Sequence, residues 1–211
     1  MKLRVQIPFF IIGLILFSYG IAVAIQVQHL GIHPWDVLNI ALFEKYGFTI
    51  GTWAVLVGLF LVVISYFLDK RYINIGTFLN ALSVGPLVDL FLYMNWTPHP
   101  SSLTSSIFVL ILGVVVMGVG GGMYSAARIG AGPRDGFMLS ISDKLGTSIS
   151  RVRIVVESLV LVLGWVLGGP VFIFTFIYTF IQSPIFQYAY HLTTKWVEIL
   201  SAPLKTKEKV S

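Results

Sequence analysis

Long apolar stretches separated by short polar connections dominate the pattern of this chain. Six stretches approach or exceed the roughly 18 to 20 apolar residues that a helix needs to cross a bilayer. They cover residues 8–27, 51–68, 75–94, 106–126, 152–168 and 171–190. The connections leave no room for a soluble domain. The pattern therefore predicts an all-α fold, a polytopic membrane helix bundle with six transmembrane helices, forming a single membrane domain over residues 1–211.

A polar motif that follows the first apolar stretch recurs after the fourth. The sequence LGIHPWDVLNIALFEKYGFTI at 30–50 aligns without a gap with IGAGPRDGFMLSISDKLGTSI at 129–149, ninety-nine positions later. The matched pairs include Gly31 with Gly130, Pro34 with Pro133, and Asp36 with Asp135. Each half, about 6–96 and about 104–195, thus holds three stretches and one motif, and a basic tail follows at 196–211. Because an odd number of spans reverses the second half, we expect two inverted three-helix repeats.

Charge supports this topology, because Lys and Arg collect in cytoplasmic loops close to membrane spans. Six spans with both termini in the cytoplasm place thirteen of the 14 Lys and Arg residues on the cytoplasmic side and leave only Lys45 outside. A composition of 56% hydrophobic and 11% charged residues also lies far from the globular norm of about 25% charged. The net charge of +5 is then explained by topology and anionic lipid. We expect the lipid bilayer as a partner and no nucleic acid.

The two motif helices, 34–46 and 133–145, are too short to span a membrane, because thirteen residues make only about 20 Å of helix. Proline suits the first position of a helix, and aspartate near the start complements the positive end of the helix dipole. We therefore expect two short helices, re-entrant or interfacial, each introduced by a glycine-containing turn. Capping of these helices by Asp36 and Asp135 is a structural alternative to a ligand-binding role.

Prolines and polar side chains also fall within the third and sixth apolar stretches. The residues concerned are Gly85, Pro86 and Asp89 in the third, and Gln182, Pro184 and Gln187 in the sixth. Transporters built from inverted repeats bind substrates near the bilayer midplane, at helices interrupted by Gly and Pro. An ionisable group inside a span, such as Asp89, indicates a functional site. Kinks that only improve packing are the structural alternative for the prolines, and Glu157 has a structural alternative as a partner of Arg153, one turn away.

Chemical motifs that would indicate catalysis are not found in the sequence. The chain has no cysteine, contains neither HExxH nor GxSxG, and carries its four histidines singly. We expect no catalytic residue, no metal and no cofactor, and thus no enzyme. A glycine cluster inside the fourth stretch contains Gly118 and Gly122, and this spacing favours close helix contact over a phosphate loop.

Three segments resemble the YczE/YyaS/YitT-like family of bacterial integral membrane proteins, over nearly the whole chain. They are GxxPWD at 31–36, GAGPRDGFMLSISDKLG at 130–146 and IGTFLNALSVGPLVDLF at 75–91. The resemblance implies a polytopic protein of the bacterial cytoplasmic membrane, in a family mostly described as uncharacterised. Some members have been proposed as transporters or linked to regulation. It supplies no catalytic residues.

The sequence thus leads to the hypothesis of a small-molecule transporter, or a substrate-binding membrane component, with its site between the two halves. The predicted ligand-binding residues are Trp35, Asp36, Asp89, Arg134, Asp135, Gln182 and Gln187. The predicted helix-break and motif residues are Gly31, Pro34, Gly85, Pro86, Gly130, Gly132, Pro133 and Pro184. A regulatory or scaffolding membrane protein without transport activity is the alternative. The ligand is not specified, and a homo-oligomer is compatible with these features.

Overall fold

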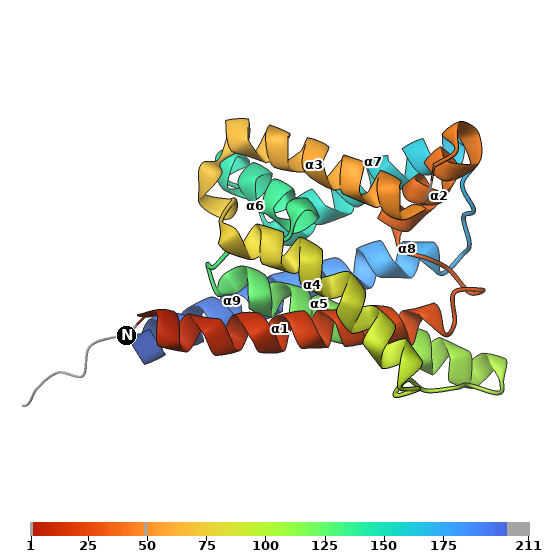
Figure 1. Cartoon of the computed structure of the whole chain (residues 1–211), viewed down its shortest axis with the longest axis horizontal. Helices are drawn as coiled ribbons and strands as arrows, with labels where there is room; N and C mark the ends of the chain where they lie inside the picture. The colour runs from red at the N-terminus through yellow and green to blue at the C-terminus, as the bar shows by residue number, and fades with distance from the viewer. Residues whose placement is uncertain (1, 49, 202–211) are drawn as a thin grey trace, which may run out of the picture.

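A computed structural model describes residues 2–48 and 50–201 of the chain, and all regular structure within them is helical (Figure 1). The helices of the first half are α1 (Lys2–Ile25), α2 (Pro34–Tyr46), α3 (Ile50–Leu68), the 3₁₀ turn η1 (Lys70–Tyr72) and α4 (Ile75–Tyr93). Those of the second half are α5 (Leu103–Ala126), α6 (Pro133–Leu145), α7 (Ile149–Val166), α8 (Thr175–Ile177), the π-helical segment η2 (Tyr178–Gln182) and α9 (Ser183–Ser201). The all-α prediction is confirmed for the described residues.

Several helices have the length and composition of membrane spans. The stretch Leu3–Ile25 of α1, the whole of α4 and the whole of α5 are long and apolar enough to cross a bilayer, and Thr52–Leu68 of α3 is a shorter apolar helix. Helix α7 is less apolar because it carries Arg151, Arg153 and Glu157. The prediction of a membrane protein with multiple apolar helices is therefore confirmed.

The two short helices have the bounds that the sequence predicts. Proline occupies the first helical position of both, at Pro34 and Pro133, and a glycine with positive φ follows the last residue of each helix. Asp36 and Asp135 lie in the first turns of these helices, as the helix-start alternative expects, but neither is the N-cap. His33 is the N-cap of α2 and its side chain accepts from the Trp35 N–H, while Gly132 takes the cap position of α6.

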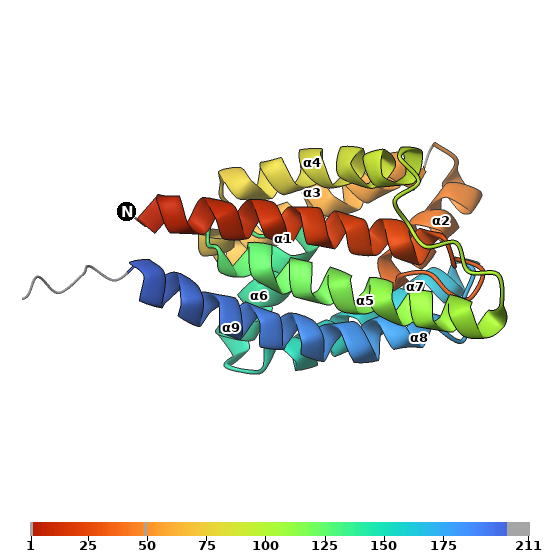
Figure 2. The ribbon, with the colours of Figure 1, turned by 90° about the horizontal axis from the view of Figure 1, so that it is seen from below.

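Helices α1 and α5 form the centre of the bundle and run in opposite directions (Figure 2). Their backbones touch. A Cβ atom built at Gly13 would lie 2.5 Å from the backbone N of Tyr124, and one at Gly120 would lie 2.3 Å from that of Phe17. Such distances admit only glycine, which lets two membrane helices approach closely. On the other side of α5, Gly122 lies equally close to the Phe186 carbonyl of α9, so the predicted close contact at the glycine cluster is confirmed.

The remaining helices pack around this pair. Helix α4 packs on α1 and α9 on α5, whereas α2 packs on α7 and α6 on α3. Helices α2 and α6 lie toward opposite ends of the bundle, and the start of α1 and the end of α9 lie at the same end (Figure 1). Helices α3 and α4 lie on the same side of the molecule in Figure 2, whereas in Figure 1 α3 runs along the top and α4 crosses the middle.

Two sequence-based expectations about helix continuity need correction, and a third holds. Helix α4 continues through Pro86, so the third span is not interrupted there. Before Pro184 the chain does leave α-helical geometry, because the π-helical segment η2 ends at Gln182. Helix α9 runs on to Ser201, beyond the predicted end at residue 190, because it stays amphipathic, with Val197 buried beside exposed Glu198. Thr49 of the repeat and the tail from residue 202 lie outside the described residues.

Candidate functional site

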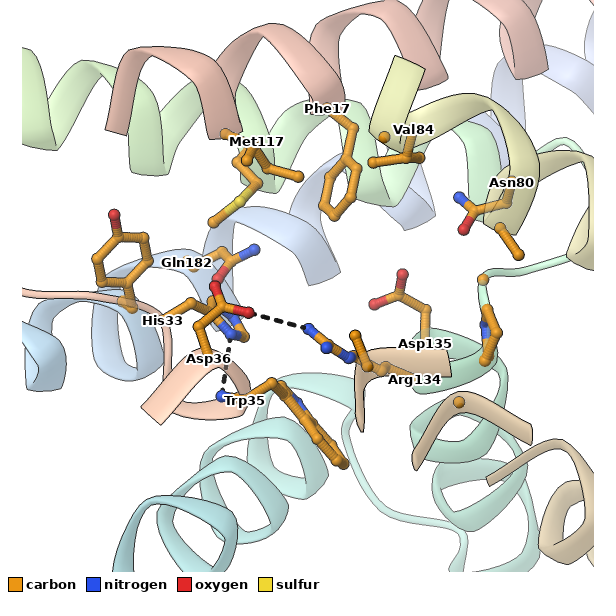
Figure 3. Close-up of a pocket in the computed structure, with 18 of the residues that line it drawn as sticks. Phe17, His33, Trp35, Asp36, Asn80, Val84, Met117, Arg134, Asp135 and Gln182 are labelled. Atoms are coloured by element: carbon orange, nitrogen blue, oxygen red, sulfur yellow. Dashed lines mark hydrogen bonds and ion pairs between the residues drawn. The ribbon is translucent and has the colours of Figure 1, made fainter. Parts of the chain in front are cut away.

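A cavity of about 540 Å³ lies where the N-terminal ends of α2 and α6 meet (Figure 3). Helices α1, α3, α4 and α5 also line it, together with Arg153 of α7 and with Tyr178 and Gln182 of η2. Five of the seven predicted ligand-binding residues line this cavity: Trp35, Asp36, Arg134, Asp135 and Gln182. Four of the predicted helix-break and motif residues line it too: Gly31, Gly85, Gly132 and Pro133. The structure therefore brings both copies of the motif to one polar site.

An open ion pair joins the two motifs inside the cavity. Arg134 Nη1 lies 3.9 Å from Asp36 Oδ1, and the two side chains are 28% and 51% exposed, so both face the cavity (Figure 3). The Arg134 guanidinium carbon also lies 5.2 Å from the centroid of the Trp35 ring, within the range of a cation–π contact. Trp35 itself is buried against Leu61 and Val160. The charged groups of this pair are thus accessible to a ligand.

A second charge cluster is closed and buried. Arg153 Nη1 donates to Asp135 Oδ1 at 2.5 Å, and Arg153 Nη2 donates to Glu157 Oε1 at 3.0 Å. The Tyr124 hydroxyl donates to the other oxygen of Asp135. Glu157 is fully buried and Arg153 is 2% exposed, which makes this cluster a buried ion triad held by hydrogen bonds. The alternative that pairs Glu157 with Arg153 is confirmed.

The two arginines of these clusters correct one part of the sequence-based topology. That topology assigned Arg134 and Arg153 to the cytoplasm with the other basic residues. In the structure Arg153 is buried and Arg134 faces the cavity. A tally of basic residues counts charge near a span, and it does not separate a side chain in a loop from one that faces the interior.

His33 is a polar cavity residue that sequence reasoning missed. Its ring accepts a 3.4 Å hydrogen bond from the Trp35 N–H at the start of α2. Burial, together with the charges of Arg134 and Arg153, holds the pKa of His33 well below its ordinary value. The imidazole is therefore neutral near pH 7 and adds no third positive charge to the cavity. Its position directly before Pro34 is the signal that could have identified it, because that is the N-cap position.

Apolar side chains form the opposite side of the cavity. Phe17, Val84 and Met117 face the polar groups across the open space (Figure 3). Buried Asn80 of α4 lies on the α6 side of the cavity, and Tyr124 is edge-on to Phe17, with 5.4 Å between ring centroids. One wall of the cavity is therefore charged and polar, and the other is largely hydrocarbon.

Several predicted residues lie elsewhere. Asp89 is exposed on α4 and Gln187 accepts from the Ser150 N–H at 2.7 Å, tying α9 to the start of α7, so neither lines the cavity. The other predicted residues outside its lining are Pro34, Pro86, Gly130 and Pro184. A ligand-binding role for Asp89 and Gln187 stays a prediction. Among the described residues no three His, Asp or Glu side chains gather in a way that could hold a metal ion.

The fold and the cavity define an integral membrane helix bundle with a charged internal site. The chain belongs to the family of unknown function DUF6198, which it matches over residues 4–191. It is 36% identical to the uncharacterized membrane protein YczE of Bacillus subtilis (strain 168) over 170 residues, which cover 81% of this chain and 78% of YczE.

Two further relatives are similar over much of their length. The uncharacterized protein YyaS of the same Bacillus subtilis strain is 31% identical over 161 residues, covering 76% of this chain and 80% of YyaS. An uncharacterized protein of Haemophilus influenzae is 32% identical over 149 residues, covering 70% of this chain and 66% of that protein. The predicted resemblance to YczE and YyaS is thus confirmed. No solved structure matches the chain.

Proposed function

We propose that the protein is a small-molecule carrier, or a substrate-binding membrane component, whose binding site is the cavity between two inverted halves. One observation carries this proposal: the N-terminal ends of both motif helices meet at one cavity, where Asp36 and Arg134 present opposite charges 3.9 Å apart. Transporters with inverted repeats hold their substrates at such half-helix ends. A scaffolding protein has no need for a cavity lined by accessible charges.

Reciprocal contacts between the halves support the inverted repeat. In the sequence alignment, Gly13 corresponds to Gly113 and Gly20 to Gly120. In space Gly13 touches Gly120, while Gly20 touches Gly113. Such an exchange of partners is the mark of a two-fold relationship, in which residue i meets j and the equivalent of j meets the equivalent of i.

The same exchange recurs outside the central pair. Gly31 lies against the backbone of Thr175, and its counterpart Gly130 lies against that of Thr77, which is the counterpart of Thr175. At the level of helices, α2 packs on α7 and α6 packs on α3. These pairs support six spans arranged as three plus three, with α2 and α6 as re-entrant helices that start inside the protein and run toward opposite ends.

The proposed location is the bacterial cytoplasmic membrane, with both termini in the cytoplasm. The start of α1 and the end of α9 lie at one end of the bundle (Figure 1). Once the interior residues Arg134 and Arg153 are set aside, eleven of the remaining twelve Lys and Arg residues belong to segments assigned to this side. Lys45 is the exception, at the end of α2.

Ligand binding and uptake by the purified protein test this function. In lipid nanodiscs, a panel of water-soluble anions, cations and zwitterions is screened for a rise in melting temperature, and the compounds that bind are tested for uptake into proteoliposomes. We expect Asp36→Asn and Arg134→Gln to weaken binding. Glu44→Gln is the matched control, because Glu44 is exposed on the same helix as Asp36 and does not line the cavity.

Two results would count against a carrier. Neither uptake nor a melting shift across the panel, with a partner protein co-purifying instead, favours the regulatory or scaffolding alternative. Equal loss of binding in Glu44→Gln and Asp36→Asn would place the ligand outside the cavity.

A further inference from the structure

The mouth of the cavity lies on the apolar side of the molecule, between α3 and α4. Eight residues that line the cavity are exposed, and five of them lie on these two helices and form the rim of the mouth: Val55, Leu59, Phe78, Ala81 and Gly85. The other three are Ile25, Gln28 and Asp36. Helix α3 packs chiefly on α6 and α2, whereas α4 packs chiefly on α1. The mouth therefore lies between two helices that pack on different neighbours. None of the five rim residues carries a polar side chain.

The surface around this mouth is apolar as well. Leu56 and Phe60 of α3 are 46% and 64% exposed, and Leu79 and Leu82 of α4 are 43% and 73% exposed. In a chain with this many apolar helices, such a surface faces lipid. A molecule that enters here comes from the hydrocarbon region of the bilayer. An apolar part of the molecule can cross this uncharged rim without a desolvation cost, because it is already outside water.

The charged residues inside the cavity determine which polar group such a molecule can carry. Asp36 and Arg134 are 3.9 Å apart, a distance at which the pair is open. A ligand with one charge would pair with one of them and leave the other without a partner in the ligand. A headgroup carrying both charges satisfies Asp36 with its cation and Arg134 with its anion. The N-terminus of α6 adds a second attraction for the anionic group.

We infer that the ligand is a single-chain amphiphile with a zwitterionic headgroup, which enters sideways from the bilayer between α3 and α4. Its headgroup binds Asp36 and Arg134, and its chain lies along Phe17, Val84 and Met117 toward the mouth. A volume of about 540 Å³ lies within the range of roughly 300 to 1,000 Å³ that is usual for small-molecule sites. This inference rests on the proposed function, because it assigns the substrate class of the same cavity.

Four probes distinguish the contribution of the ligand's alkyl chain from that of its headgroup charges. They are N-octyl-N,N-dimethylglycine, which has an octyl chain and both charges; octyltrimethylammonium and octanoate, which have the chain and one charge; and N,N,N-trimethylglycine, which has both charges and no long chain. Melting temperatures are measured in nanodiscs at equal probe-to-lipid ratios. We expect N-octyl-N,N-dimethylglycine at ten times its Kd to raise the melting temperature by about 3 to 6 °C. The other three should give less than half of that shift.

The route is tested by narrowing the mouth. Gly85 is exposed at the rim, and a Cβ atom built there meets nothing within 4 Å outside its chain neighbours, so a side chain has open space at its base. The melting temperature of Gly85→Trp is measured first to show that the variant folds. Leu82→Trp is the matched control, because Leu82 is exposed on the same helix and does not line the cavity. We expect Gly85→Trp to slow association of N-octyl-N,N-dimethylglycine at least tenfold, while Leu82→Trp leaves it unchanged.

Different results would overturn the ligand class, its headgroup or the proposed function. Equal binding of N,N,N-trimethylglycine and its octyl form, with Gly85→Trp binding both normally, overturns the amphiphile and its route but leaves the proposed carrier standing. A larger shift from octyltrimethylammonium or octanoate than from the zwitterion overturns the headgroup assignment. Binding of none of the four probes overturns the inference, and only failure of the wider panel of soluble compounds overturns the proposed function as well.

Discussion

Trp35 and Arg134 occupy the same position in the two copies of the motif, and they contact each other, with the Arg134 guanidinium carbon 5.2 Å from the centroid of the Trp35 ring. A contact between two such counterparts is what the proposed two-fold arrangement of the halves requires. Helices α2 and α6 thus contact each other at their first turns. The aspartates that follow, Asp36 and Asp135, both line the cavity, but Asp36 is exposed in it, whereas Asp135 is buried and bonded to Arg153 and Tyr124.

These surroundings predict different costs for the same substitution. Asp135→Asn removes a charge partner from buried Arg153, which should destabilise the protein by about 3 to 5 kcal/mol. Asp36→Asn breaks an open and partly exposed pair, and about 0 to 1 kcal/mol is expected. Thermal unfolding of both variants in detergent compares them. Similar melting temperatures for the two variants would mean that the charge clusters do not differ as described.

Arg153 is the shared partner of two carboxylates, so its replacement should destabilise the protein more than Asp135→Asn does. Arg153→Met leaves Asp135 and Glu157 buried without their cation, and we expect little folded protein to be recovered. A triple variant that adds Asp135→Asn and Glu157→Gln removes the stranded charges and should restore much of the yield. Size-exclusion chromatography of the detergent-solubilised protein measures it. Equal yields of the single and triple variants would contradict an electrostatic cause.

The central helix contact predicts different outcomes for two glycines. Gly120→Ala places a methyl group within 2.3 Å of the Phe17 backbone N, and the helices must separate, at a cost of about 1 to 3 kcal/mol. Gly85→Ala meets nothing within 4 Å outside its chain neighbours, and the gain in helix propensity is opposed by the following Pro86, so a change of less than about 1 kcal/mol is expected. The melting temperatures of the two variants, each compared with the wild type, test this difference. Tolerance of alanine at Gly120 would show that α1 and α5 are not in backbone contact.

His33 predicts an acid sensitivity. Its pKa is lowered by burial and by neighbouring arginines, so the folded state favours the neutral ring, whereas the unfolded chain binds a proton near pH 6.5. The stability that depends on neutral His33 is therefore present above pH 6.5 and is lost as the pH falls below it.

The conservative replacement for this test is His33→Asn, because asparagine is a good N-cap and does not titrate. We expect the melting temperature of the wild type to fall more than that of His33→Asn between pH 7.5 and pH 5.5. Parallel pH profiles for the two proteins would exclude His33 as the source of the acid sensitivity.

The motif helices were predictable because local chemistry determines them. Proline at the first position and glycine after the last define α2 and α6 at both ends, whatever the rest of the chain does. The convergence of Asp36 and Arg134 was also within reach, since an inverted repeat brings matching helix ends to one site. The bounds of α9 were harder to predict, because its amphipathic pattern continues past the apolar stretch without a break.

Asp89 illustrates what a sequence cannot supply. Its apolar neighbours indicate depth in the membrane, but consecutive residues of a helix point about 100° apart. Val88 is buried against α1, and Asp89 next to it is exposed. Tyr124 and Arg153 pose the converse problem, because each is one polar residue among many apolar ones. Their convergence on Asp135 becomes visible only when α5, α6 and α7 are placed together.

The backbone contact between α1 and α5 also limits how the molecule can move. Side chains that separate two helices can repack and let them slide, but two backbones in direct contact have no such layer to rearrange. At Gly13 and Gly120 the two helices are therefore held in direct backbone contact. If the proposed ligand enters between α3 and α4, those two helices can part without disturbing this contact, because they share no extensive contact with each other.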